Sequence, residues 1–363
     1  MLVSRLGLIS GFAFHAAEGR RICVNLRGTL GSSLPSAHQQ THACSKRSSV
    51  SMSTTHHQER ATKIVTGVRE LCDKYDGFIL DQFGVLHDGE VALPGAVECL
   101  EELRTKGKRL VILSNTSKRE AFTMNRLPKF GFRTDLFDGG VTSGEEGYQY
   151  LARSGLVGGK AMLLGWNGED TDGFLEAMSL EYSSAREATF LLCHGPDTIV
   201  DDAGTTRTGT RNSGSLEPYE ALFKVAVDRD LPMYNVNPDF SVNNPQGGHW
   251  YMPGLISKKY EEMGGRVHYF GKPHKEHFEA AAKKMGLEKD KVVHVGDSLA
   301  HDIYGAAAAG LDSVFIAGGI SGEELGIDAK AGRPPFEVSP KALEKLFARE
   351  SVTPTFTMPL FAL

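Results

Sequence analysis

The sequence has few of the features that mark a secreted, membrane-spanning or nucleic-acid-binding protein. Its five cysteines form no C-x-x-C pair, and an odd number without framework spacing indicates reduced thiols in a non-secretory compartment. No apolar run approaches the roughly 20 residues needed to span a bilayer. The formal net charge is −5, and an acidic protein is a poor candidate for binding the phosphates of a nucleic acid.

This charge is unevenly distributed along the chain. Residues 1–55 contain six lysines and arginines but a single acid, Glu18, whereas the remainder has 34 basic and 44 acidic residues. A segment rich in serine and arginine and poor in acids is typical of an organelle transit peptide. The many serines and threonines of its second half favour a chloroplast over a mitochondrion, and a disordered cytoplasmic tail is the alternative interpretation.

The rest of the chain contains short apolar runs that end in residues able to do chemistry. Run 78–80 precedes Asp81, run 110–113 precedes Ser114 and Asn115, run 267–270 precedes Gly271 and Lys272, and run 292–295 precedes Gly296 and Asp297, with Asp302 close behind. Continuous apolar runs of this length predict strands of a parallel sheet that is buried on both faces. Open α/β sheets bind their ligands beyond the carboxyl ends of such strands.

Helical spacing separates several of these strands. Pro94 and Gly95 open a helix in which Ala96, Leu100 and Leu103 recur at helical spacing, and the strand at 110–113 follows. Such a β-α-β unit predicts a right-handed crossover and a parallel strand pair. Residues 60–75 are predicted to form a helix, and the polar stretch 201–215 a loop.

The order carboxylate, hydroxyl, lysine, carboxylate resembles the motifs of the haloacid dehalogenase-like hydrolases, most of which are phosphatases. The resemblance covers roughly residues 60–345. The long insertion between Ser114 and Lys272 is similar to that of the capped subgroup with nitrophenyl-phosphatase-like and phosphoglycolate phosphatase-like enzymes. It implies an α/β fold, a doubly wound Rossmann-like parallel-sheet core with an inserted α/β cap. We expect residues 56–145 and 253–345 to form the core, 146–252 the cap and 346–363 a C-terminal tail.

The resemblance also implies a Mg²⁺-dependent reaction on a small phosphorylated metabolite. Asp81 would be the nucleophile, Ser114 would bind a phosphoryl oxygen, and Lys272 would neutralise both. The metal ligands would be Asp81, the backbone carbonyl of Phe83, Asp297 and Asp302, the last of them directly or through water. Taken singly, each of these residues also fits a turn, a helix cap or a surface lysine. Their occurrence together and in this order favours an active site. The protein could also form a homo-oligomer.

Three further residues are candidates for binding the substrate. Asn115 follows the serine of the second motif. Asn237 and Asp239 belong to an Asn-Pro-Asp stretch that resembles one at the cap edge of the cleft in the same subgroup. Ordinary turn chemistry is the competing interpretation of the Asn-Pro-Asp stretch.

The first motif departs from the family pattern at one position. The family has Asp-x-Asp, in which the second Asp protonates the leaving oxygen, and this chain has Phe83 there. Help of that kind is worth about 10²–10⁴-fold in rate. The chain therefore acts on esters with good leaving groups, uses a substitute such as His87 or Asp88, or binds a phosphorylated ligand with little turnover. A dehalogenase is a further alternative, but carbon–halogen displacement has no need of a metal ligand at Asp297.

Overall fold

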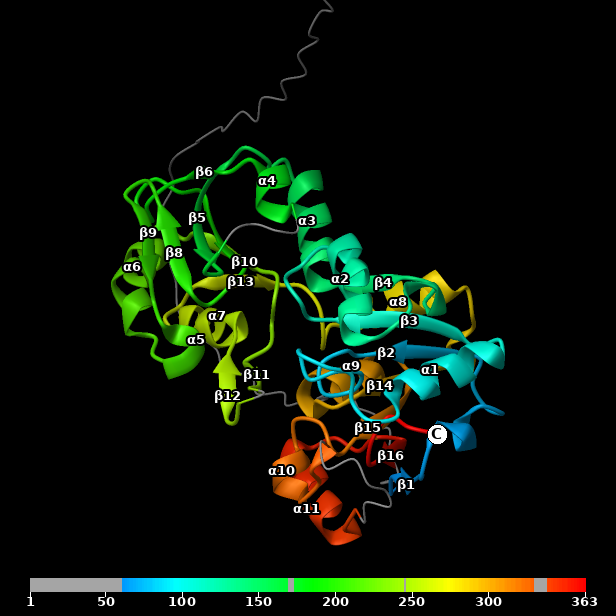
Figure 1. Cartoon of the computed structure of the whole chain (residues 1–363). Helices are drawn as coiled ribbons and strands as arrows, with labels where there is room; N and C mark the ends of the chain where they lie inside the picture. Colours follow the sequence, from blue (N-terminus) through cyan, green and yellow to red (C-terminus); the bar gives the residue numbers. More distant parts are fainter. Residues whose placement is uncertain (1–60, 169–172, 245, 330–337) are drawn as a thin grey trace, which may run out of the picture. The chain divides into compact units, whose positions relative to one another are not determined.

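The computed structural model of the protein describes residues 61–168, 173–244, 246–329 and 338–363, and the predicted transit segment, residues 1–55, lies outside them. Every described residue belongs to one packed unit, residues 57–363. Two sheets and a small hairpin make up its strands (Figure 1). Within the described ranges, no helix combines the length and the apolar character that crossing a membrane requires.

The first sheet has seven strands, and all of its neighbouring pairs are parallel. In spatial order they are β1 (Lys63–Ile64), β16 (Phe356–Met358), β15 (Asp312–Ile316), β14 (Val292–Gly296), β2 (Gly77–Leu80), β3 (Arg109–Ser114) and β4 (Gly140–Thr142). The helices associated with it are α1 (Ala96–Thr105), α2 (Glu120–Arg126), α8 (Lys275–Met285), α9 (Tyr304–Ala308), α10 (Gly322–Leu325) and α11 (Pro340–Glu350).

Helices cover both faces of this sheet, as strand β2 illustrates. Phe78 and Leu80 pack into the apolar cluster that includes α1, whereas Ile79 between them packs into the cluster that includes α8 and α9. All three side chains are fully buried. Successive side chains of a strand point to opposite faces, so a strand covered on both sides must be apolar at every position. The predicted doubly wound α/β fold is confirmed.

The second sheet is mixed and also has seven strands. Its order is β13 (Arg266–Tyr269), β10 (Pro232–Asn235), β7 (Phe190–Cys193), β5 (Lys160–Gly165), β8 (Thr198–Asp201) and β9 (Gly204–Arg207), with β6 (Glu181–Tyr182) also paired to β5. Helices α6 (Glu217–Asp228) and α7 (Pro253–Glu262) pack on one face, and α3 (Ser143–Arg153) and α4 (Phe174–Met178) on the other. This part of the chain also contains α5 (Thr210–Ser213) and the antiparallel hairpin of β11 (Ser241–Asn243) and β12 (His249–Tyr251).

The predicted return to the core near Pro253 is wrong. Strand β13 pairs in parallel with β10 of the second sheet, and α7 packs into the same apolar cluster as α6. The chain reaches the first sheet only after Tyr269, and so the strand predicted to precede Lys272 in the core belongs to the second sheet. Its residues alternate between exposed and half-buried, which is the pattern of an edge strand.

The C-terminal segment is also not a tail. Strand β16 lies between β15 and β1, and Phe361 beyond it is 1% exposed. A three-residue strand is too short to display a period, which explains why the sequence pattern missed it. The helix predicted at 60–75 is also wrong, since the described residues of this segment, 61–75, contain β1 and a single 3-10 turn, Val68–Leu71. The loop predicted at 201–215 contains all of β9 and the short helix α5.

Candidate functional site

Three strands of the first sheet end at the same edge, and each is followed by a polar side chain. Asp81 follows β2, Ser114 ends β3, and Asp297 follows β14. Because β14 pairs with β2 and β2 with β3, these three ends are neighbours in the sheet. Lys272 arrives from the second sheet, three residues after the end of β13. The sequence motifs therefore meet, although one of them comes from a different sheet than predicted.

The ammonium group of Lys272 links two carboxylates in the interior. Its Nζ lies 2.9 Å from Oδ1 of Asp81 and 2.7 Å from Oδ1 of Asp302, and the lysine side chain is 3% exposed. Burial by itself lowers the pKa of a lysine, but the charges of Asp302 and Asp81 outweigh it and raise the pKa of Lys272 above its usual value. Lys272 is therefore a permanent cation in contact with Asp81.

Asp302 is the carboxylate that anchors this contact. Its Oδ1 also receives Nε2 of His294 at 2.8 Å, and its Oδ2 accepts the backbone N–H of Ser298 at 3.0 Å. Burial raises the pKa of this carboxyl, yet Lys272 and His294 reverse the effect and hold the pKa below its ordinary range. Asp302 thus stays ionised and keeps Lys272 in place.

Asp81 and Asp297 experience the opposite electrostatic environment. Burial raises the pKa of Asp81, and the Asp302 charge adds to the rise while Lys272 opposes it. Burial and the charges of Asp81 and Asp302 raise the pKa of Asp297 well above its ordinary range. One oxygen from each of the three aspartates lies within 4.8 Å of the others, and all three residues are buried.

This group of carboxylates fits a hard divalent cation. Three buried acids face one lysine, so a cation would relieve an excess of negative charge, and oxygen donors are the ligands that Mg²⁺ takes in proteins. Two glycines make room for Asp297. A Cβ atom at Gly84 would lie 2.0 Å from its Oδ2, and one at Gly319 would lie 2.2 Å from its Cβ. The backbone N–H of Ile320 donates to Oδ2 of Asp297 at 2.7 Å.

Phe83 lies in the tight turn between Asp81 and Gly84, and Gly84 adopts a φ of 80° that favours glycine. Its ring packs against Gly89, where a Cβ would lie 2.9 Å from the ring. A phenyl ring that contacts Gly89 and His87 therefore stands at the sequence position where the family pattern has a carboxyl. The carbonyl of Phe83 as a metal ligand stays a prediction.

The two residues considered as substitutes for the missing acid have other contacts. His87 is buried and stacks on Phe130 with ring centroids 4.0 Å apart, and its Nδ1 accepts the N–H of Gly89 at 3.1 Å. Burial lowers the pKa of His87 to about 4, and the charge of Arg126 contributes. His87 is therefore neutral at pH 7.

Asp88 is held in a local turn. Its Oδ1 accepts the backbone N–H groups of both Glu90 and Val91 at 2.9 Å. This bonding pattern is that of an Asx turn, in which the carboxylate shapes the backbone. Asp88 and His87 thus serve the loop that follows the first motif.

Asn115 connects the serine loop, the lysine and the second sheet. Its Oδ1 accepts the backbone N–H of Lys272 at 2.6 Å, and its Nδ2 donates to the carbonyl of Lys272 at 3.1 Å and to Oδ1 of Asp239 at 2.8 Å. Asn237 is buried and accepts the N–H of Asp239 through its Oδ1 at 3.2 Å. Substrate binding by these three residues stays a prediction, and the two bonds of Asn115 hold the backbone of Lys272 in place.

Two histidines near the site escaped the sequence analysis. His294 lies inside β14 and contacts Asp302, but in the sequence it is one residue of an apolar run and shows no sign of a polar partner. Nδ1 of His301 lies 3.7 Å from Oδ1 of Asp239, and its ring centroid lies 6.0 Å from that of Phe240. His301 directly precedes Asp302, and this spacing was the one available signal for it.

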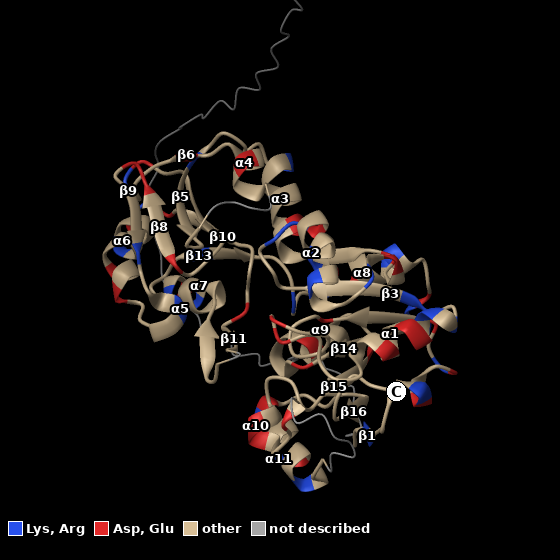
Figure 2. Ribbon diagram, in the orientation of Figure 1, with Lys and Arg blue, Asp and Glu red and all other residues tan. Residues whose placement is uncertain are grey.

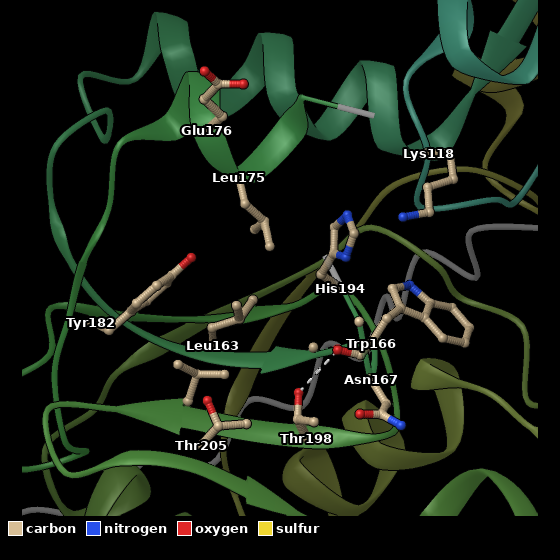
Figure 3. Close-up of a pocket in the computed structure, with 13 residues that line it drawn as sticks. Lys118, Leu163, Trp166, Asn167, Leu175, Glu176, Tyr182, His194, Thr198 and Thr205 are labelled. Atoms are coloured by element: carbon tan, nitrogen blue, oxygen red, sulfur yellow. Dashed lines mark hydrogen bonds between the residues drawn. The ribbon is translucent and has the colours of Figure 1, made fainter. Parts of the chain in front are cut away.

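Two cavities adjoin these elements. The first, about 440 Å³, lies against the second sheet and includes Leu163, Leu175, Lys118 and His194 (Figure 3). We call it the sheet cavity. The second, about 780 Å³, is bounded by Phe83, Gly84, Asn243, His249, Gly319 and Glu323, and we call it the hairpin cavity.

Comparison with known proteins places this geometry in context. Residues 78–177 match the family model described as haloacid dehalogenase-like hydrolase, and residues 269–343 match a second model of HAD-hydrolase-like proteins. The 4-nitrophenylphosphatase of Schizosaccharomyces pombe is 25% identical over 70% of this chain and 88% of its own length. The ribonucleotide monophosphatase NagD of Escherichia coli K12 is 29% identical over 70% of this chain and 92% of its own.

Solved structures share the fold. A haloacid dehalogenase-like hydrolase from Brucella suis 1330 aligns with a TM-score of 0.63 at 24% identity, covering 83% of this chain and all of that one. The 4-nitrophenylphosphatase of Thermotoga maritima aligns with a TM-score of 0.55 at 24% identity, covering 80% of this chain and 96% of that one.

The charge excess of the cluster makes a prediction about stability. The folded protein binds a proton at Asp81 more tightly than the unfolded chain does, so the ionised carboxyl destabilises the fold as the pH rises above about 4. We expect Asp81→Asn to raise the free energy of unfolding at pH 8 by on the order of 1–3 kcal/mol, and by less at pH 5. Urea unfolding of chelator-treated protein at both pH values measures this.

The matched control for this prediction is Asp76→Asn. Asp76 is exposed and lies 2.9 Å from Lys108, which lowers the pKa of its carboxyl. Its removal should be neutral or slightly destabilising, by less than about 1 kcal/mol. A loss of stability in Asp81→Asn at pH 8, or a gain of the same size at pH 5, would contradict the electrostatic account of the cluster.

Proposed function

We propose that this chain, which belongs to the haloacid dehalogenase-like hydrolases, is a phosphatase that hydrolyses a small phosphomonoester through Asp81. The observation that carries the proposal is the contact of Lys272 with both Asp81 and Asp302 at the strand ends. A carboxylate nucleophile next to a fixed cation suits attack on phosphorus, because the cation offsets the charge of both anions. The phosphatase names of the relatives in fission yeast and E. coli support the same reaction class.

Each residue has a role that follows from its contacts. An oxygen of Asp81 attacks the phosphorus as the bond from phosphorus to the alcohol oxygen breaks, and the departing anion takes its proton from solvent. Water then attacks the phosphorylated Asp81, which releases inorganic phosphate and restores the carboxylate. Ser114 stands at the end of the neighbouring strand, where its hydroxyl can donate to a phosphoryl oxygen. Lys272 neutralises charge on Asp81 and on the phosphoryl group, and Asn115 fixes the backbone of Lys272 from both sides.

Magnesium is the cofactor that we propose. Asp81, the carbonyl of Phe83 and Asp297 would hold it, with Asp302 acting directly or through water. Bound Mg²⁺ supplies positive charge that stabilises the phosphoryl oxygens. Asp302 already receives Lys272, His294 and Ser298, so its principal contribution is to orient Lys272.

Phe83 sets the limit of this chemistry. A phenyl ring has no proton to donate to the departing alcohol, and His87 and Asp88 are occupied in the neighbouring loop. Esters of acidic alcohols, whose anions leave without protonation, should therefore be the better substrates. A phospholigand-binding protein with little turnover is the second candidate, and Phe83 is the observation that favours it.

Residues 1–55 give the proposal a cellular context. Their composition suits a chloroplast transit peptide, with a mitochondrial one or a cytoplasmic tail as alternatives. The proposed partner is a small phosphorylated metabolite. The oligomeric state is a separate question, and a homo-oligomer is compatible with the proposal.

The first experiment measures phosphate release from 4-nitrophenyl phosphate by protein lacking residues 1–55. We expect turnover with Mg²⁺, none with chelator, and a loss of about 10³-fold or more in Asp81→Asn, because the nucleophile is gone. Circular dichroism would confirm that the variant is folded. Turnover that survives Asp81→Asn would reject Asp81 as the nucleophile. Binding of phosphate esters without any turnover would favour the second candidate, a phospholigand-binding protein.

The second experiment restores the missing acid with Phe83→Asp. We expect kcat/KM for an alkyl ester such as glycerol 3-phosphate to rise by about 10²–10⁴-fold, and that for 4-nitrophenyl phosphate to change little. Phe83→Asn is the matched control, because it has the same shape but no acidic proton. An equal response of the two variants would show that space, and not proton transfer, limits the reaction.

A further inference from the structure

The hairpin cavity reaches the carboxylate cluster through two glycines. Gly84 and Gly319 line the cavity, and the positions of their absent Cβ atoms lie 2.0 and 2.2 Å from atoms of Asp297. Only glycine backbone therefore separates this end of the cavity from the Asp297 side chain. A phosphoryl group on Asp81, which belongs to the same cluster as Asp297, would then have its alcohol near this end of the cavity.

One wall of the hairpin cavity is apolar. The ring of Phe83 lines it, and so does Leu93. Gly89 allows the ring to lie flat against the loop, since any side chain there would collide with it. With a volume of about 780 Å³, the cavity is in the range that holds a small organic ligand.

The charged groups of the cavity are mostly acidic. Asp88, Glu323 and Glu324 line it, and the two glutamates open helix α10, whose acidic residues are visible in Figure 2. Arg349 is the one cation among the described lining residues. Both oxygens of Glu324 hold its guanidinium, at 2.7 and 2.9 Å, so its charge is already compensated.

We propose that the hairpin cavity takes the alcohol half of the phosphomonoester and selects an alcohol with an apolar face and no negative charge. This inference rests on the proposed phosphatase function. An anionic alcohol, such as one with a carboxylate or a second phosphate, would face the carboxylates of Asp88 and Glu323, because Glu324 and Arg349 neutralise each other. A neutral or cationic alcohol meets no such repulsion and gains contact with Phe83.

The sheet cavity offers the contrasting possibility. Its described lining includes Lys118, from the loop that follows Ser114, and a single acid, Glu176 (Figure 3). An alcohol placed there would have no reason to avoid negative charge. The charge preference of the enzyme therefore distinguishes the two cavities.

The test uses three phenyl phosphates that carry a 4-aminomethyl, 4-hydroxymethyl or 4-carboxymethyl group. The methylene carbon keeps the acidity of the three phenols similar, so differences report on charge in the cavity. We expect kcat/KM to be at least about tenfold lower for the carboxymethyl ester than for the other two. Equal values, or a preference for the carboxymethyl ester, would overturn the inference.

Charge reversal at the cavity wall supplies the second arm. Glu323→Lys should reduce the discrimination against the carboxymethyl ester by about tenfold. Glu344→Lys is the matched control, because Glu344 is exposed on α11 and makes the same change in net charge outside the cavity lining. An equal effect of both variants would assign the preference to overall charge and reject the cavity. If Glu323→Lys fails to fold, Asp88→Asn removes a charge and keeps the oxygen that accepts from Glu90 and Val91.

Binding separates this inference from the proposed function. Calorimetric titration of Asp81→Asn with the three esters measures the same preference without any turnover. The unmodified protein could fail to hydrolyse 4-nitrophenyl phosphate while Asp81→Asn binds the carboxymethyl ester at least about tenfold more weakly than the other two esters. In that case the phosphatase proposal fails and the selection by the cavity stands. Equal binding of the three esters would reject the selection even if hydrolysis is found.

Discussion

The buried contact of Lys272 with Asp81 and Asp302 is the interaction on which the rest of the site depends. Removing Lys272 would leave two carboxylates without their cation in the interior, and breaking a buried ion pair in this way costs about 3–5 kcal/mol. The protein surrounds the contact with neutral donors, including His294 and the Ser298 amide on Asp302. Asn115 holds the lysine backbone, so the charge has one fixed position.

The same contact explains how the two sheets are joined at the site. Lys272 follows the edge strand β13 of the second sheet, whereas both of its carboxylate partners follow strands of the first. Asn115 adds a bond to Asp239, which follows β10 of the second sheet. The elements that would select a substrate are therefore tied to the residues that would react with it.

Runs of apolar residues in the sequence predicted the buried strands of the first sheet and the polar residues at their ends. Buried parallel strands must be apolar throughout, and for this reason Asp81, Ser114 and Asp297 stand out at their ends. The sheet to which a strand belongs is not recorded in this way. Strand β13 looked like a core strand because pairing with β10 depends on contacts distant in sequence. Strand β16 is too short to show a period, and it was missed.

The polar network was harder to predict for a different reason. His294 and His301 gain their significance from partners placed by tertiary structure, and a single histidine in a sequence carries no sign of them. The hydrogen bond from Asn115 to Asp239 likewise joins residues 124 positions apart.

Phe83 connects the chemistry to the choice of substrate. A carboxyl at this position would add a fourth acid near Asp81 and Asp297, whose pKa values are already raised by burial and by the Asp302 charge, and the phenyl ring adds no such charge. The ring also lines the hairpin cavity, so the residue that removes the proton donor supplies the apolar wall. Loss of general acid catalysis and preference for an alcohol with an apolar face would then have one structural origin.

The most direct test of this account is to trap the covalent intermediate. The protein is mixed with 4-nitrophenyl phosphate and Mg²⁺, quenched in acid within one turnover, digested and analysed by mass spectrometry. The account predicts that the peptide containing Asp81 gains the mass of one phosphoryl group, and that fragmentation places it on Asp81. Release of nitrophenol in the same interval with the phosphoryl group on another residue, or on none, would contradict it.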